Sequence, residues 1–261
     1  MQNRQMGKGA ERKTFCALFL YENEKTGKML CREKEISAQD RKSLKDGLRT
    51  GEMELLVIGY PGLQQAARLA AEQRDALRHT IPDWMLDEVI RTDERLQEAF
   101  VKLIGETPAD ISDEMVQTEI SDERGCTDKS DETAQTEMSD ERVRADKFDE
   151  KEKCLGILFP IADKGIFAGL WELGEALCCG IDGQILQIPM KQSVIEICNA
   201  QRINPYEIPS AGSGLFVTGY GRRMEDFFAK KDLPAAVIGR ITAGADRVLR
   251  MEDQVRYLGS E

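Results

Sequence analysis

The 261-residue sequence lacks the residues that several classes of metal enzyme require. It has one histidine, His79, whereas a His-rich zinc site, a 2-His-1-carboxylate iron site and a two-histidine protease helix each need at least two imidazoles. These three classes are excluded for this chain. His79 follows an expected helix, where an interaction with the negative end of the helix dipole is a sufficient role for it.

Basic residues are in the minority. Lys and Arg number 36 against 47 Asp and Glu, so the formal charge at pH 7 is −11. Proteins that bind nucleic acid neutralise phosphates with clustered Lys and Arg, and an acidic chain repels the same polyanion and anionic membrane surfaces. No apolar run approaches the roughly 20 residues that span a bilayer. We therefore expect neither a nucleic-acid partner nor a membrane association.

The cysteines do not form a recognisable metal or disulfide pattern. There are seven, an odd number, and no two are spaced C-x-x-C. The first twelve residues are polar and basic, unlike a secretory signal, so we expect a reduced, cytoplasmic protein. Cys178, Cys179 and Cys198 lie among apolar residues and are expected to be small core residues.

One segment carries most of the negative charge. Residues 110–153 hold 16 acids and 7 bases, a net of −9, and contain a tandem duplication. Residues 112–129 and 130–147 match at 12 of 18 positions. Neither copy has enough large apolar residues to bury a face, so residues 107–153 are expected to be a disordered, low-complexity insertion. A charged, exposed helix is the alternative, because 18 residues equal five helical turns.

The rest of the sequence alternates strand and helix patterns. Strands are expected at 14–21, 28–32, 53–58, 155–161, 184–188, 214–218, 235–242, 247–250 and 255–258. Helices are expected at 37–48, 63–78, 83–104, 165–179, 191–202 and 222–231, with Trp84 on the inward face of the third. This order predicts a layered α/β domain that the acidic insertion interrupts.

Several short sequence segments resemble segments of the C-terminal domain of the aminoimidazole ribonucleotide (AIR) synthase superfamily and follow one another in the same order. They are LLVIGYPGLQQAARLAAE (55–72), GIFAGLWELGEA (165–176), IPMKQSVIEIC (188–198), NPYEIPSAGSGLFV (204–217), AAVIGRITAGADRVL (235–249) and VRYL (255–258). They look most like clostridial AIR-synthase-related and hydrogenase-maturation-factor proteins. The superfamily also contains selenophosphate synthetase and thiamine monophosphate kinase.

The resemblance implies a three-layer α/β (α+β) fold, like that of the PurM C-terminal domain. Residues 55–258 would form this domain, and residues 1–54 would be a hairpin and helix extension. The N-terminal domain that supplies most ATP contacts and the metal-binding acids in the superfamily has no counterpart in residues 1–54. ATP with Mg²⁺ is therefore expected only if a partner supplies that domain.

The sequence departs from the superfamily where relatives read His-Asp-Val-Thr-x-Gly-Gly. The matching stretch begins Phe159-Pro160 and keeps only the last glycine, Gly165. Without the His, the Asp and the Thr hydroxyl, neither proton transfer nor close approach to a phosphate is supported there. We therefore expect no catalytic residue and no metal ligand. Trp171 and Glu172, on the helix that follows, are expected to pack and to cap within the fold.

A Ser/Gly turn remains as a candidate phosphate contact. Gly212, Ser213 and Gly214 match the superfamily's turn before a central strand, and together with Gly165 they could present backbone N–H groups and a hydroxyl to a phosphate. The alternative is a tight turn that uses the conformational freedom of glycine to enter a buried strand. No lysine stands in a Walker-type pattern beside it.

Three functions follow from these observations. The first is a stand-alone, non-catalytic domain that acts as a binding or scaffold module for a nucleotide, a protein partner or a second copy of the chain. The second is an ATP-dependent enzyme of the hydrogenase-maturation or ligase type, completed by a separate ATP-binding subunit. The third is an interaction protein whose acidic duplication binds a basic partner. We rank them in this order.

Overall fold

The computed structural model describes residues 15–24, 29–50, 53–105 and 152–259. Its strands are β1 (Cys16–Asn23), β2 (Met29–Glu35), β3 (Glu54–Ile58), β4 (Glu152–Pro160), β5 (Gly180–Gln184), β6 (Gly214–Thr218), β7 (Ala235–Thr242), β8 (Arg247–Met251) and β9 (Gln254–Tyr257). Its helices are α1 (Ala38–Thr50), α2 (Leu63–Glu72), α3 (Arg74–Leu77), α4 (Asp83–Gly105), α5 (Gly165–Leu177), α6 (Gln192–Gln201), α7 (Gly221–Ala229) and a 3₁₀ turn, η2 (Ile185–Gln187).

These strands form one sheet, in the order β2-β1-β4-β6-β3-β7-β5-β8-β9. All neighbouring strands run antiparallel except β5 and β8, which are parallel. The central strand β3 alternates between two cores: Leu56 and Ile58 face one, and Leu55 and Val57 face the other. A strand buried on both faces needs such a continuous apolar run, and this identifies β3 as the middle of a layered fold.

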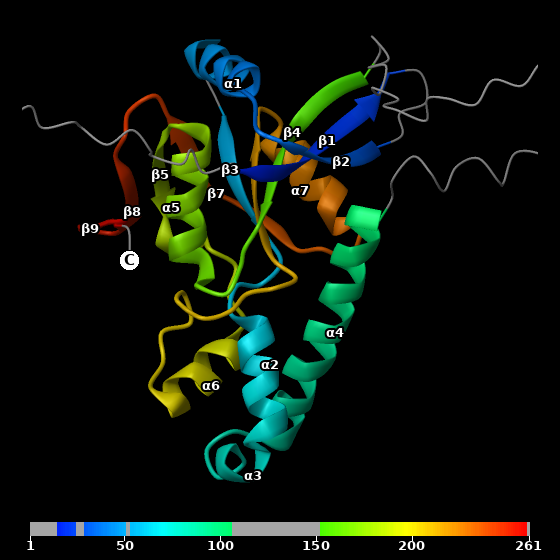
Figure 1. The fold of residues 1–261 in the computed structure, drawn as a ribbon. Coiled ribbons are helices and arrows are strands. Elements are labelled where there is room, and N and C mark those ends of the chain that lie inside the picture. The colour runs from blue at the N-terminus through cyan, green and yellow to red at the C-terminus, as the bar shows by residue number, and fades with distance from the viewer. Residues whose placement is uncertain (1–14, 25–28, 51–52, 106–151, 260–261) are drawn as a thin grey trace, which may run out of the picture.

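Helices cover both faces of the sheet, which gives three layers (Figure 1). One core receives Leu63 of α2, Leu86 of α4 and Val194 of α6, and Figure 1 shows α2 and α4 lying side by side. The opposite core receives Leu44 of α1 and Leu170 of α5. The predicted three-layer α/β fold is therefore confirmed.

The N-terminal hairpin continues the same sheet. The strands β1 and β2 pair in antiparallel fashion, and β1 also pairs with β4, so that Phe19 lies opposite Ile157. Phe19 is buried in the core that α1 and α5 cover. The predicted hairpin and helix within residues 1–54 are present, and the division at residue 54 stays a prediction.

Two predicted elements differ from the structure. The helix expected over 63–78 is broken at Gln73, whose φ of −118° lies outside the helical region. After the break, Leu77 of α3 is buried in the core, and Arg74 forms an ion pair with Asp87 of α4 at 2.7 Å. The strand expected over 184–188 is instead β5, which ends at Gln184, followed by η2. The first residue of β5 is a glycine, Gly180, because a Cβ atom at this position would collide with the hydroxyl of Thr242 on the paired strand β7.

Two predicted core residues lie on the surface. Trp84 is 64% exposed, because Leu86 and Val89 supply the buried face at that end of α4. Cys178 is exposed, because α5 ends at Leu177 and Cys178 adopts the left-handed conformation that turns the chain toward β5. Cys179 and Cys198 are buried as expected, and burial raises the pKa of their thiols to about 12 and about 11.

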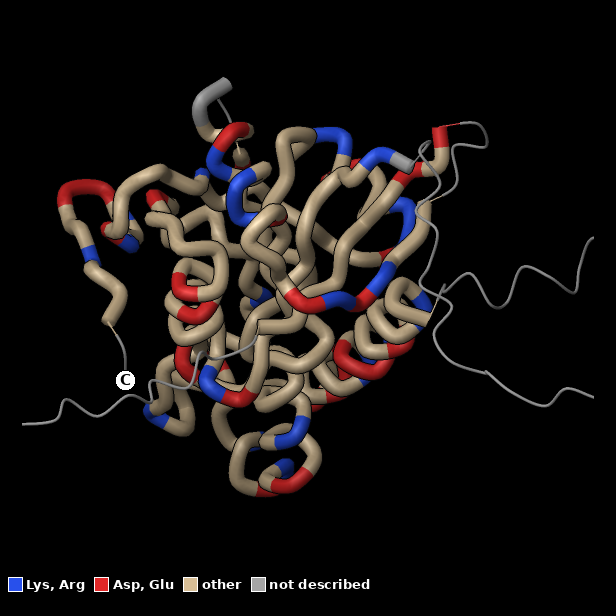
Figure 2. The backbone as a smooth tube through the Cα atoms, turned by 45° about the horizontal axis from the view of Figure 1, so that its top comes forward, with Lys and Arg blue, Asp and Glu red and all other residues tan. Residues whose placement is uncertain are grey.

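The predicted insertion over 107–153 lies outside the described residues except at its end, where β4 begins at Glu152. Acidic and basic residues are interspersed over the described part of the chain (Figure 2). None of the described helices is long and apolar enough to cross a membrane.

Candidate functional site

The Ser/Gly turn is closed by its own hydrogen bonds. The Ser213 hydroxyl and the Ser213 backbone N–H both donate to the carbonyl oxygen of Ser210, the latter at 3.2 Å. The Ser213 carbonyl in turn accepts a hydrogen bond from the N–H of Ile161, at 3.0 Å. Ser213 is 1% exposed, so its hydroxyl lies inside the fold. The group that could have met a phosphate is used within the turn.

Ser210 fastens this turn to the start of α2. Its hydroxyl donates to the Ile208 carbonyl at 2.8 Å and accepts a hydrogen bond from the N–H of Gly62 at 2.7 Å. Gly62 precedes α2, so this contact satisfies one of the N–H groups that the first turn of a helix leaves without an intrahelical partner. The turn therefore joins α2 to the beginning of β6.

The four candidate phosphate residues do not share one set of neighbours. Gly165 has a φ of +78°, and a Cβ atom there would lie 2.5 Å from the Tyr206 carbonyl oxygen. Gly212 has a φ of +77° and lies against Gln97 of α4, whereas Gly214 pairs with Pro160 at the end of β4. The start of α5 therefore leaves no room for a side chain at Gly165, and the residues around Gly165 are not those around Gly212.

One cavity of the described residues is a groove along α5, which we name the α5 groove. It has a volume of about 870 Å³ and is lined by Phe15, Arg41, Lys164, Phe167, Ala168, Trp171, Glu172, Glu175, Cys178, Arg256, Tyr257, Leu258 and Gly259. Its walls come from α5, from α1 and from the segment at and after β9. Of the predicted site residues, Gly165 alone adjoins this groove, next to Lys164.

Three cations of the α5 groove come from different parts of the chain. Arg41 of α1 donates from Nε to the Ala176 carbonyl at 2.7 Å. Arg256 of β9 donates to Glu207 at 2.9 Å, and its guanidinium carbon lies 4.1 Å from the centre of the Phe167 ring. Lys164 is exposed just before α5. These contacts fix the two guanidinium groups at the rim of the groove.

A buried arginine lies behind the groove. Arg247 is 8% exposed and pairs with Glu175 at 2.7 Å, while its guanidinium carbon lies 4.3 Å from the centre of the Trp171 ring. Trp171 therefore packs as expected. Glu172 does not cap: it is exposed and lines the groove. The Glu175 carboxylate is balanced by Arg247, which leaves Glu172 as the acid of the groove without a cation partner among the described residues.

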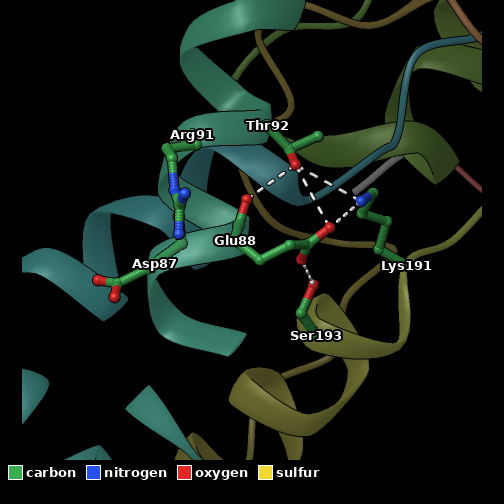
Figure 3. A network of polar contacts seen from close by, with 6 residues as sticks. All are labelled: Asp87, Glu88, Arg91, Thr92, Lys191 and Ser193. Atoms are coloured by element: carbon green, nitrogen blue, oxygen red, sulfur yellow. Dashed lines mark hydrogen bonds and ion pairs between the residues drawn. The ribbon is translucent and has the colours of Figure 1, made fainter. Parts of the chain in front are cut away.

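A polar network joins α4 to the start of α6 on the opposite side of the sheet (Figure 3). The Glu88 carboxylate accepts hydrogen bonds from Lys191 and from the Ser193 hydroxyl, the latter at 3.0 Å, and the Thr92 hydroxyl donates to the Glu88 carbonyl at 2.8 Å. Burial alone would raise the pKa of Glu88, but the hydrogen bonds from Lys191 and Ser193 outweigh it and lower that pKa. The network is closed and clamps two helices.

Sequence reasoning missed Arg41 and Arg256 as groove residues. No local motif could have identified them, because the groove is assembled from segments more than 200 residues apart in the sequence. No three His, Cys, Asp or Glu side chains of the described ranges gather closely enough to hold a metal ion.

Comparison with known proteins gives structural likenesses alone. No family model and no curated protein matches the sequence. The chain is similar to the hydrogenase maturation protein HypE in complex with ATP, at 16% identity over 40% of this chain and 35% of that one, with a TM-score of 0.35. A thiamine-monophosphate kinase from Stenotrophomonas maltophilia is 14% identical over 76% of this chain and 50% of that one, with a TM-score of 0.41.

The PurL protein of T. maritima complexed with FGAR is also similar, at 10% identity over 79% of this chain and 27% of that one, with a TM-score of 0.38. The match thus spans half or less of each of these chains. At 10–16% identity, these likenesses concern the fold alone. The clostridial attribution stays a prediction.

Proposed function

We propose that this chain is an AIR-synthase-like domain that binds a ligand or a partner without catalysing a phosphate reaction. The observation that carries the proposal is the closed Ser/Gly turn, in which the N–H and the hydroxyl of Ser213 both donate to Ser210. A phosphate that accepted hydrogen bonds from both donors would leave the buried Ser210 carbonyl oxygen without them, and an unsatisfied buried group of this kind costs about 1–3 kcal/mol.

The end of β4 supports the same proposal. Phe159 and Pro160 stand where the superfamily has a His and an Asp, and they are the last residues of β4. A phenyl ring and a pyrrolidine ring neither accept nor donate a proton, so general acid or base catalysis has no group at these positions. The strand end contributes apolar packing, since Phe159 packs against the core beneath α5.

The binding surface that we propose is the α5 groove. Its volume of about 870 Å³ lies within the range of small-molecule sites, and aromatic rings and charged groups line it together. For the surface outside the groove, we propose that the chain binds a protein partner or a second copy of itself. We do not propose a nucleic-acid partner, because acidic and basic residues are interspersed in the view of Figure 2 and the formal charge of the chain is −11.

An ATP hydrolysis assay with Mg²⁺ tests the proposal. The purified full chain is expected to release phosphate no faster than a buffer blank. Hydrolysis at an enzyme-like rate that falls in a Ser213→Ala variant would contradict the proposal. Hydrolysis that appears only after a co-purified second chain is added would instead favour an enzyme completed by a separate ATP-binding subunit.

A further inference from the structure

We infer that the α5 groove is a binding site for a small organic anion with an aromatic body, of the carboxylate or sulfonate class. This inference deepens the proposed function and rests on it, because it names the class of ligand that the binding domain takes. It is carried by two guanidinium groups that are held in place yet keep unused hydrogen-bond donors, beside aromatic side chains in the same groove.

Arg256 is the first of these groups. In the register of β8 and β9 it lies opposite Leu249, which is buried in the core under α5, so the Arg256 side chain stands on the α5 side of the sheet. Its contacts with Phe167 and Glu207 hold the guanidinium plane. A guanidinium has five N–H donors, and the Glu207 contact uses one of them, so donors remain for a ligand.

Arg41 is the second group. Its Nε is occupied by the Ala176 carbonyl, whereas its two terminal nitrogens form no hydrogen bond within the described residues. Lys164 adds a third cation and forms no ion pair within those residues. Restrained guanidinium groups lose little conformational entropy when they bind an anion, and they pair well with planar carboxylates.

The charge balance of the groove favours an anion. Arg41, Lys164 and Arg256 face it together with Glu172 and Glu175, and the buried Arg247 neutralises Glu175 from behind. Glu207 pairs with Arg256 in the same way, so these four cations stand against three acids, and the groove with its ion-pair partners keeps a net charge of +1 within a chain whose formal charge is −11. Such a contrast directs an anion toward the groove and away from the remaining surface.

The aromatic side chains specify the body of the ligand. Phe15, Phe167, Trp171 and Tyr257 line the groove. Phe167 is only 6% exposed, because its ring lies against both Tyr206, at a centroid distance of 5.1 Å, and the Arg256 guanidinium, so it offers little surface to a ligand. Trp171 is partly exposed and is held in place by Arg247, and Tyr257 is 72% exposed. Fixed aromatic walls favour a flat apolar body, since stacking adds to the burial of its surface. A small inorganic anion would leave these walls uncovered.

Fluorescence titration with anilinonaphthalene sulfonate (ANS) tests the inference, because ANS is an aromatic anion. The chain has two tryptophans, Trp84 on α4 and Trp171 in the groove, so a Trp84→Phe background leaves Trp171 as the reporter. We expect saturable quenching of Trp171 and energy transfer to ANS. The neutral analogue N-phenylnaphthylamine is expected to bind at least about tenfold more weakly, since it lacks the charged group.

Matched variants test which cations of the groove bind the charged group of ANS. Arg256→Gln and Lys164→Gln are each expected to raise the Kd of ANS by about three- to tenfold, and neither should change the binding of the neutral analogue. Arg250→Gln is the control: Arg250 is 45% exposed and bonded to Asp182, much as Arg256 is 48% exposed and bonded to Glu207, but Arg250 does not line the groove. Lys164 is exposed and has no described ion pair, so its variant is expected to fold normally.

The inference is overturned if the neutral analogue binds as tightly as ANS, or if Arg250→Gln weakens ANS binding as much as Arg256→Gln does. An unchanged Kd in both the Arg256 and the Lys164 variants would overturn it as well. These outcomes are separate from the failure of the proposed function, which depends on ATP hydrolysis and on Ser213.

Discussion

The Ser/Gly turn and the α5 groove differ in how their polar groups are used. In the turn, the hydroxyls of Ser210 and Ser213 are hydrogen-bonded within the fold, and Ser213 is buried. In the groove, Arg41 is held by one hydrogen bond and Arg256 by one hydrogen bond and the Phe167 ring, and both keep further donors. A polar group satisfied inside the protein stabilises the fold, whereas a held but incompletely paired cation can meet a ligand.

The openness of the groove can be tested most strongly at two adjacent cysteines. Cys178 lines the groove and is exposed, whereas Cys179 is buried and burial raises its pKa to about 12. At pH 8 only about one in ten thousand Cys179 thiols would be ionised, so alkylation by iodoacetamide should favour Cys178 by roughly a hundredfold or more. Fragmentation of the peptide that carries both residues measures the ratio, and equal labelling would mean that the groove wall is not as described.

The close packing of Gly165 at the start of α5 predicts a large loss of stability when this residue is replaced. In Gly165→Ala the new Cβ would have to occupy a left-handed conformation 2.5 Å from the Tyr206 carbonyl oxygen. We expect the free energy of unfolding to fall by about 2–3 kcal/mol, measured by urea denaturation. Gly105→Ala, at a position where a Cβ meets nothing within 4 Å, is the control. Equal stability of the two variants would remove the packing explanation for Gly165.

The Ser210 side chain is expected to contribute nearly as much to the stability of the fold as Gly165 does. Ser210→Ala removes the acceptor for the Gly62 N–H at the start of α2, in a buried position. We expect a loss of about 1–2 kcal/mol in the free energy of unfolding, since the N–H is left without its partner. Urea denaturation measures this loss, and Lys164→Gln in the groove should change the same quantity by less than about 0.5 kcal/mol. A larger loss at Lys164 than at Ser210 would reverse the comparison.

The smallest expected effect lies in the network of Figure 3. The folded state lowers the pKa of Glu88, so its contribution is fully present above the ordinary pKa of a glutamate and is lost as the pH falls through the lower, folded-state pKa. Glu88→Gln should cost about 1 kcal/mol at pH 7, because the pair is partly exposed, and little at pH 3. Unfolding at several pH values tests this.

Glu98→Gln, at an exposed position on the same helix, is the matched control for Glu88 and should show no such pH dependence. A cost of Glu88→Gln that stayed constant down to pH 3 would mean that the Glu88 carboxylate is not what clamps α4 to α6.

The strands in the middle of the sheet could be predicted from the sequence. The strands β6 and β7 have the expected bounds because their apolar residues lie between glycine and proline signals. The strand β5 could not be placed, since GIDGQ contains one large apolar residue and depends on pairing with β7 and β8. The break of the 63–78 helix at Gln73 likewise depends on a contact with α4, which no local pattern encodes.

The candidate site, like the fold, could be predicted from the sequence only in part. The sequence indicates a Ser/Gly turn, and its glycines also indicate the alternative of a tight turn into a buried strand. Whether its hydroxyls face inward depends on Gly62 and Ile208, which the motif does not contain. The α5 groove carries no motif, because Arg41 and Arg256 are brought together only when α1 and β9 pack beside α5.

The most direct test of this account compares Ser213→Ala with Arg256→Gln in one experiment, measuring for each the free energy of unfolding and the Kd of ANS. Ser213→Ala is expected to lower the free energy of unfolding by about 1 kcal/mol and to leave the Kd of ANS unchanged. Arg256→Gln is expected to raise the Kd of ANS by about three- to tenfold and to change the free energy of unfolding by less than about 0.5 kcal/mol. The opposite pattern, with ANS binding lost at Ser213 and stability lost at Arg256, would contradict it.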